Sequence, residues 1–216
     1  MTTDFKPYLM NNTNLKIKIE RELTLYFEAM KMERKASKKN MALNLSEYQI
    51  YRHFSVGGNL IVGICNILIS NNVSHEMQCT QLYDMTFESF NKIEYMYNDL
   101  ASFEKDIKEK STSNLIIVLK HERQYDKWQD AIDEAVQMLK EELKSFEILA
   151  MLISFDDGCV RLADMLRRIV QCIFDQSYHS TRYSFNSHFV IGNIVDSQIS
   201  SASTTPSTSN KGHCNI

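Results

Sequence analysis

Three polar side chains at four-residue spacing could together bind a divalent cation. Asn98, Ser102 and Asp106 lie in the string NDLASFEKD, within a segment that we predict to be helical. At about 100° per residue, a four-residue step drifts by only ~40°, so the three side chains share one face over roughly 12 Å of helix axis. That face presents an amide oxygen, a hydroxyl and a carboxylate, which are the hard oxygen ligands that suit Mg²⁺.

The charge of this face indicates how such an ion would be held. A single carboxylate binds Mg²⁺ weakly, and the shell is completed by waters and by the phosphate oxygens of a substrate. Spacing alone also fits a different interpretation, because Asn, Ser and Asp are ordinary residues of an exposed helix surface. The choice between the two depends on the rest of the chain.

The same string resembles the second metal-binding motif of class I terpene synthases, NDxxSxxxE or NDxxSxxxD. The matching positions are Asn98, Asp99, Ser102 and Asp106, with the shorter Asp where Glu is more usual. The resemblance implies that Asn98, Ser102 and Asp106 bind one Mg²⁺, with Mn²⁺ as an alternative. It also implies that Lys105, which precedes the acidic residue, faces the substrate diphosphate.

Two further segments resemble the same family. The chain resembles the microbial and amoebal type of class I terpene synthase. Arg52, followed by the pair Gly57-Gly58, matches the diphosphate-sensing Arg that precedes a helix break. Arg182-Tyr183 matches the Arg-Tyr pair near the C-terminus, and both side chains could donate to phosphate oxygens. Taken singly, a helix-end ion pair explains Arg52 and a surface loop explains Arg182-Tyr183.

The family's first motif, an Asp-rich DDxxD or DDxxxD/E, does not occur before Asn98. The resemblance therefore implies an N-terminally truncated bundle that exposes apolar surface. It implies Mg²⁺-dependent release of diphosphate from geranyl, farnesyl or geranylgeranyl diphosphate, weakened because half of the metal cluster is missing. The alternative is a catalytically inactive helical module. A chain-elongating prenyltransferase is disfavoured, since such enzymes carry two Asp-rich motifs.

Composition favours long helices, because the 216 residues include only two Pro and six Gly. We predict one all-α domain over 1–196, the C-terminal part of a class I terpenoid synthase bundle, and a disordered Ser/Thr-rich tail over 197–216. Asn114 is predicted to cap a helix. The expected helices span 14–38, 46–52, 60–70, 74–109, 115–119, 126–152 and 160–174.

Other features narrow the function. A net charge of −3 gives no basis for nucleic-acid binding. The five scattered Cys, with no secretory signal and no bilayer-length apolar run, predict a cytoplasmic protein with reduced thiols and no membrane span. Phe87 and Tyr95 are candidates to line a cavity for a cationic intermediate, with core packing as the alternative. The expected partner is a prenyl diphosphate, and the oligomeric state stays open.

Overall fold

The computed structural model describes residues 13–38, 43–61 and 73–179, and within these ranges it contains helices and no strand. The predicted all-α class is therefore confirmed. The tail over 197–216 and the pair Arg182-Tyr183 lie outside the described residues, so those predictions remain predictions.

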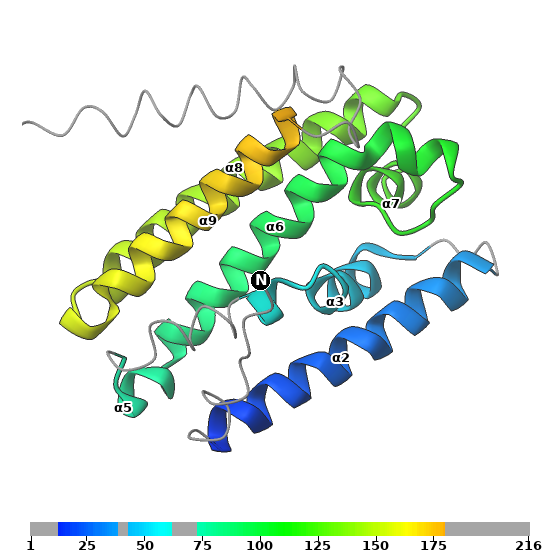
Figure 1. Cartoon of the computed structure of the whole chain (residues 1–216). Helices are drawn as coiled ribbons and strands as arrows, with labels where there is room; N and C mark the ends of the chain where they lie inside the picture. Colours follow the sequence, from blue (N-terminus) through cyan, green and yellow to red (C-terminus); the bar gives the residue numbers. More distant parts are fainter. Residues whose placement is uncertain (1–12, 39–42, 62–72, 180–216) are drawn as a thin grey trace, which may run out of the picture.

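Helix α6 (Gln81–Lys108) runs through the middle of the structure and contacts α3, α7, α8 and α9 (Figure 1). It can lie there because most of the side chains around the helix are either apolar or polar with hydrogen-bond partners. Phe90, Ile93 and Leu100 are among its buried apolar residues, while Asp99 and Ser102 are buried polar ones. An ordinary surface helix buries only one stripe, so α6 is a core helix.

Helices α8 (Trp128–Ile153) and α9 (Val160–His179) lie along one side of α6 (Figure 1). The buried face of α8 includes Ala131 and Ala135, whose small side chains let helix axes approach closely, and Phe146, which packs against Phe90 of α6. The short 3₁₀ helix η1 (Asp157–Cys159) turns the chain between α8 and α9.

Helices α2 (Thr13–Lys38) and α3 (Leu45–Ser55) pack together on another side of the structure (Figure 1). A capping box starts α3, because Asn44 accepts from the backbone N–H of Glu47 and Glu47 accepts from that of Asn44. The helix ends before Gly57, whose φ of 90° favours glycine. The break that follows the predicted sensor helix is therefore present.

Most predicted boundaries shift by one to five residues, and one predicted helix is divided. The helix expected over 74–109 is two helices, α5 (His75–Gln78) and α6, because Thr80 accepts from the backbone N–H of Tyr83 and starts a new helix. The cap predicted at Asn114 is confirmed at the start of α7 (Leu115–Glu122). Of the helix predicted over 60–70, residues 58–61 are helical and the remainder lies outside the described residues.

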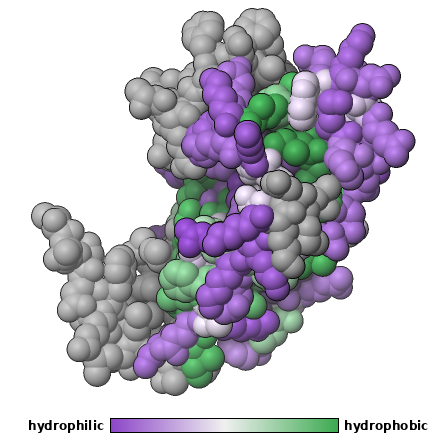
Figure 2. Space-filling view, turned by 90° about the vertical axis from the view of Figure 1, so that its right-hand side faces the viewer, coloured by the Kyte–Doolittle hydropathy of each residue, from purple (hydrophilic) through white to green (hydrophobic). Residues whose placement is uncertain are grey.

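Large apolar side chains are exposed on described helices and in the turn after α8. Phe27 is 57% exposed, Ile50 63% and Phe155 79%. Figure 2 shows apolar patches between polar side chains on one face of the molecule. Among the described helices, none combines the length and the apolar character that crossing a bilayer requires.

Candidate functional site

Asn98, Ser102 and Asp106 lie on one face of α6, as their spacing predicts. Ser102 is buried, and its hydroxyl donates to Oδ2 of Asp106 at 2.6 Å. The side chain of Asp106 is 15% exposed. A hydroxyl has one proton and two lone pairs, so donation to Asp106 leaves Ser102 Oγ able to act as a ligand.

Arg52 reaches this face from α3. Its Nη2 donates to Oδ1 of Asn98 at 2.9 Å and to Oδ1 of Asp99 at 2.6 Å, and its Nε donates to the same Asp99 oxygen at 3.0 Å. The structure thus brings the predicted sensor and the first predicted ligand into direct contact. An amide oxygen has two lone pairs, so accepting from Arg52 does not by itself exclude a metal.

Asp99 joins three helices at this point. Its side chain is fully buried, and besides Arg52 it accepts from the Tyr48 hydroxyl of α3 and from the backbone N–H of Leu115, which lies 2.7 Å away at the start of α7. These donors compensate the cost of burying a carboxylate. Asp99 therefore holds Arg52 and α7 against α6, and its own oxygens are enclosed by protein.

Burial and charge oppose each other in this ion pair. Burial by itself lowers the pKa of Arg52, but the Asp99 carboxylate and Tyr48 outweigh burial and raise that pKa above its ordinary value. Burial raises the pKa of Asp99, while Arg52, Tyr48 and the Leu115 N–H act in the opposite direction. With its side chain 13% exposed, Arg52 is a permanent cation held beside the predicted metal ligands.

Asn114 links α7 to the same face. Its Nδ2 donates to the backbone oxygen of Asp99 at 2.8 Å and to Oδ2 of Asp106 at 2.9 Å, while its Oδ1 accepts from the N–H of Ile116. The side chain is fully buried. The residue that caps α7 therefore also contacts the carboxylate of the predicted metal site.

Helix α2 contributes a carboxylate near Arg52. Burial raises the pKa of Glu33 above its ordinary value, and this shift is opposed by the Arg52 charge and by a hydrogen bond from Ser55. The charges of Asp99 and Asp106 raise it further, which places Glu33 within electrostatic range of both. Glu33 carried no recognisable signal in the sequence.

The remaining predicted diphosphate contacts are less defined. Lys105 lies along α6, where its Nζ is 3.1 Å from Glu109 and 3.8 Å from Oδ1 of Asp106. It is partly exposed and could turn toward an anion without breaking a buried contact. Arg182 and Tyr183 lie outside the described residues.

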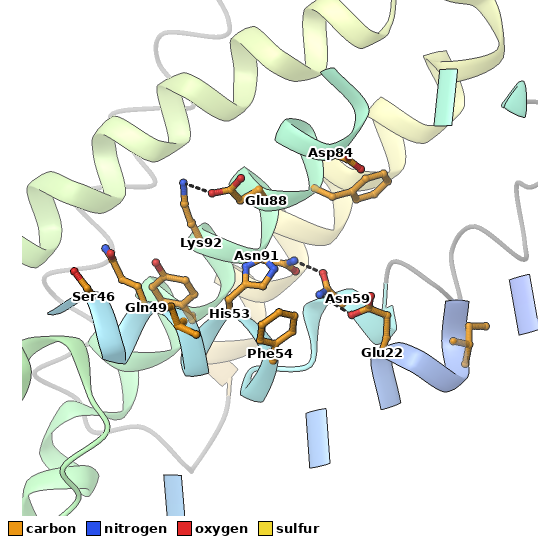
Figure 3. A pocket seen from close by; sticks show the side chains of 14 residues that line it. Glu22, Ser46, Gln49, His53, Phe54, Asn59, Asp84, Glu88, Asn91 and Lys92 are labelled. Atoms are coloured by element: carbon orange, nitrogen blue, oxygen red, sulfur yellow. Dashed lines mark hydrogen bonds and ion pairs between the residues drawn. The ribbon is translucent and has the colours of Figure 1, made fainter. Parts of the chain in front are cut away.

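A pocket of about 700 Å³ is lined in part by residues of α6 that precede Asn98 (Figure 3). Asn98, Ser102 and Asp106 are not among its lining residues. Tyr95 and Asn91 line it about one and two turns before Asn98 along α6. Phe87 also lines it, so both aromatic candidates from the sequence border this space. The other lining residues come mainly from α2, α3 and α6: Ile19, Glu22, Ser46, Gln49, Ile50, His53, Phe54, Asn59, Asp84, Glu88 and Lys92.

A polar network closes one side of the pocket. Asn91 donates to Asn59, which in turn donates to Glu22 of α2 at 2.8 Å (Figure 3). Oδ1 of Asn91 and Oε2 of Glu94 are buried, and neither has a hydrogen-bond partner among the residues that the structure describes. Both oxygens lie within 2.2 Å of the point that a β-carbon on Gly58 would occupy. Burial raises the pKa of Glu94 to about 7, and the Arg52 charge opposes that shift.

The donor set fits a magnesium site of low charge. Within the described part of the chain, no group of three or more His, Cys, Asp or Glu side chains could hold a metal ion, so a site made of such side chains alone is not present there. The candidate set has one carboxylate, one hydroxyl and one amide oxygen, all hard donors suited to Mg²⁺ or Mn²⁺. Such a set is expected to bind firmly only when an anionic ligand contributes further oxygens.

Tyr48, Asp99 and Asn114 support the site, and the sequence only partly pointed to them. Tyr48 lies four residues before Arg52 and therefore on the same face of its helix, which is a signal that could have been used. Asp99 belongs to the recognised motif, but its role as a buried acceptor depends on α3 and α7. Asn114 was identified only as a cap.

Comparison with known proteins identifies the family and a similar fold. A family model described as "Terpene synthase family 2, C-terminal metal binding" matches residues 12–145, which is more than half of the chain. The crystal structure of α-eudesmol synthase is similar in fold, with a TM-score of 0.59 and 22% sequence identity. The similarity covers 89% of this chain and 59% of that chain. A search of curated proteins found no match.

Proposed function

Because the chain belongs to the class I terpene synthases, as a member of terpene synthase family 2, we propose that it binds a prenyl diphosphate and releases diphosphate from it with the help of Mg²⁺. The substrate class is geranyl, farnesyl or geranylgeranyl diphosphate, and the product is a terpene. The residues assigned to the metal are Asn98, Ser102 and Asp106.

One observation carries this proposal: a permanent cation lies directly beside three oxygen ligands. Arg52 contacts Asn98 at 2.9 Å, and Ser102 contacts Asp106 at 2.6 Å on the same face of α6. A diphosphate needs both a divalent ion and fixed cationic donors to stabilise the charge that develops when it departs. An ordinary exposed polar stripe has no reason to place a nearly buried Arg there.

The side chains of the site would divide the work. The bound metal supplies Lewis-acid stabilisation of the leaving diphosphate. Arg52, held by Asp99, offers its guanidinium donors to diphosphate oxygens, and Lys105 adds a charge from the edge of the site. We assign the same role to Arg182 and Tyr183 from the resemblance. Asn98, Ser102 and Asp106 hold the ion so that substrate oxygens complete its shell.

The pocket lined by α6 residues before Asn98 would receive the prenyl chain. Phe87 and Tyr95 line it, and aromatic faces favour a neighbouring cation. Charged side chains, including Glu22 and Glu88, also line it, so the pocket as described is more polar than a hydrocarbon requires. The chain spans 59% of the length of α-eudesmol synthase, whose fold has further segments for which this chain has no counterpart in the match.

The test is to incubate the purified 216-residue chain with Mg²⁺ and each of the three diphosphates. We expect Mg²⁺-dependent pyrophosphate release with a hydrocarbon in the headspace, and loss of both in Asn98→Ala. Gln137→Ala, an exposed amide on α8, is the matched control and should retain activity. Normal turnover by Asn98→Ala contradicts the assigned site.

A second candidate is a catalytically inactive helical module, favoured by the absence of an Asp-rich motif before Asn98. The two candidates differ in a direct way. A module without activity yields no pyrophosphate and no hydrocarbon from any of the three substrates, even where binding of Mg²⁺ with inorganic pyrophosphate is measurable.

A further inference from the structure

The buried amide of Asn114 is attached to the predicted metal site through a single carboxylate oxygen. Its Nδ2 carries two protons, and the structure uses both, one on the backbone oxygen of Asp99 at 2.8 Å and one on Oδ2 of Asp106 at 2.9 Å. Its Oδ1 accepts from the N–H of Ile116 at 3.0 Å. A fully buried side chain with all these contacts made has one orientation.

The fixed orientation of Asn114 restricts the Asp106 carboxylate. Its Oδ2 accepts from both Asn114 and the Ser102 hydroxyl, so rotation of the carboxylate about its last bond would break two hydrogen bonds. Its other oxygen, Oδ1, is 3.8 Å from the Lys105 ammonium, which is beyond hydrogen-bond length. The two donors therefore fix the orientation of the Asp106 carboxylate.

We propose that Asn114 is a positioning residue that fixes the Asp106 carboxylate in the orientation needed to bind a divalent cation together with Asn98 and Ser102. It acts through Asp106 and does not contact the ion. The inference rests on the proposed function, since it presupposes the metal site. Partners that orient a metal-binding carboxylate affect affinity by about 10–100-fold in other proteins.

Capping and positioning by Asn114 can be separated by substitution. Ser and Thr are good N-caps, because their hydroxyl can accept from the first backbone N–H groups of α7. A hydroxyl carries one proton on a shorter side chain and cannot donate to both Asp99 O and Asp106 Oδ2. Asn114→Ser and the bulkier Asn114→Thr should therefore retain the cap and release Asp106.

The experiment measures binding of Mn²⁺ to the 216-residue chain in the presence of inorganic pyrophosphate, from the electron paramagnetic resonance signal of free Mn²⁺. We expect affinity about 10–100-fold weaker in Asn114→Ser and Asn114→Thr than in the wild type, and loss of binding in Asp106→Ala. Thr80→Ala removes the N-cap of α6 far from the site, and it should lower the unfolding midpoint without changing the affinity.

The outcomes distinguish the positioning role from the metal site itself. If both Asn114 variants bind Mn²⁺ like the wild type while Asp106→Ala does not, Asn114 has no positioning role and the metal site stands. If the wild type does not bind, or Asp106→Ala binds equally well, the metal site and the positioning role are both wrong. If Thr80→Ala weakens binding as much as Asn114→Ser, the effect reflects lost stability and the positioning role is also overturned.

Discussion

Replacing Glu94 by Gln should stabilise the protein at pH 8 and change its stability little at pH 5. Glu94 is 8% exposed, and within the described part of the chain its buried Oε2 has no hydrogen-bond partner. Burial raises the pKa of this carboxyl from 4.5 to about 7, against the opposing charge of Arg52. A neutral amide of nearly the same shape avoids the cost of burying the ionised form.

The magnitude follows from the pKa. Between pH 4.5 and about 7, the folded state holds a proton on Glu94 that the unfolded state has released. The stabilisation from this proton is fully present below pH 4.5 and is lost as the pH rises through 7. Each pKa unit corresponds to about 1.4 kcal/mol, so the whole loss is on the order of 3 kcal/mol.

The assay is urea unfolding of the wild type and Glu94→Gln at pH 5 and pH 8. The advantage of the variant in free energy of unfolding should be about 2–3 kcal/mol larger at pH 8 than at pH 5, because the folded wild type carries a mostly ionised Glu94 at pH 8 and a protonated one at pH 5. Glu88→Gln, on the same helix with its side chain 55% exposed, is the matched control and should change by less than about 0.5 kcal/mol at both pH values.

An equal advantage at both pH values would refute this reasoning. It would mean that Glu94 is ionised in the folded protein, held by the Arg52 charge against the effect of burial. A protonated Glu94 would instead be a donor that could reach Oδ1 of Asn91, since both oxygens lie within 2.2 Å of one point beside Gly58. One proton would then satisfy both unpartnered oxygens.

Two further substitutions test the packing around the site. Asp99→Asn should lower the free energy of unfolding by about 3–5 kcal/mol, because Arg52 would remain buried without its counter-charge. Urea unfolding measures this difference. An unchanged free energy of unfolding would show that the ion pair does not contribute to stability. Gly58→Ala should lower the free energy of unfolding by about 1–3 kcal/mol in the same assay, since the new β-carbon would lie 2.1 Å from Glu94 Oε2 and 2.2 Å from Asn91 Oδ1. An unchanged free energy of unfolding would show that both side chains move aside freely.

The sequence predicted the helices because their apolar periodicity and caps are local signals. Asn114, for example, was identified as a cap from its place before an apolar run, and it starts α7 in the structure. The split between α5 and α6 was missed because both segments are helical, and only the hydroxyl of Thr80, accepting from the Tyr83 N–H, marks a new start. A Thr within a helical pattern gives no such signal by itself.

The site was predictable only as far as resemblance and helical spacing reach. Spacing placed Asn98, Ser102 and Asp106 on one face of α6, and resemblance added Arg52. No local pattern could show that Arg52 contacts Asn98, because the two residues are 46 positions apart in the chain. Glu33 is the clearest omission from the sequence-based prediction, since its position near Arg52 depends entirely on how α2 packs beside α3.

The helical geometry of α6 explains why the nine-residue string NDLASFEKD contains the three predicted metal ligands and also Asp99, which holds the neighbouring helices in place. Asp99 is seven residues before Asp106, which is within about 20° of two full turns, so the two residues lie nearly in line along the helix. An amide approaching from α7 can therefore contact the backbone of one and the carboxylate of the other, as Asn114 does. Asn98, about 100° from Asp99, contacts Arg52, whose guanidinium also binds Asp99. The buried Asp99 thus fixes both neighbours of the metal-binding face, the guanidinium on one edge and the start of α7 on the other. A substitution at Asp99 should consequently impair metal binding without removing any ligand.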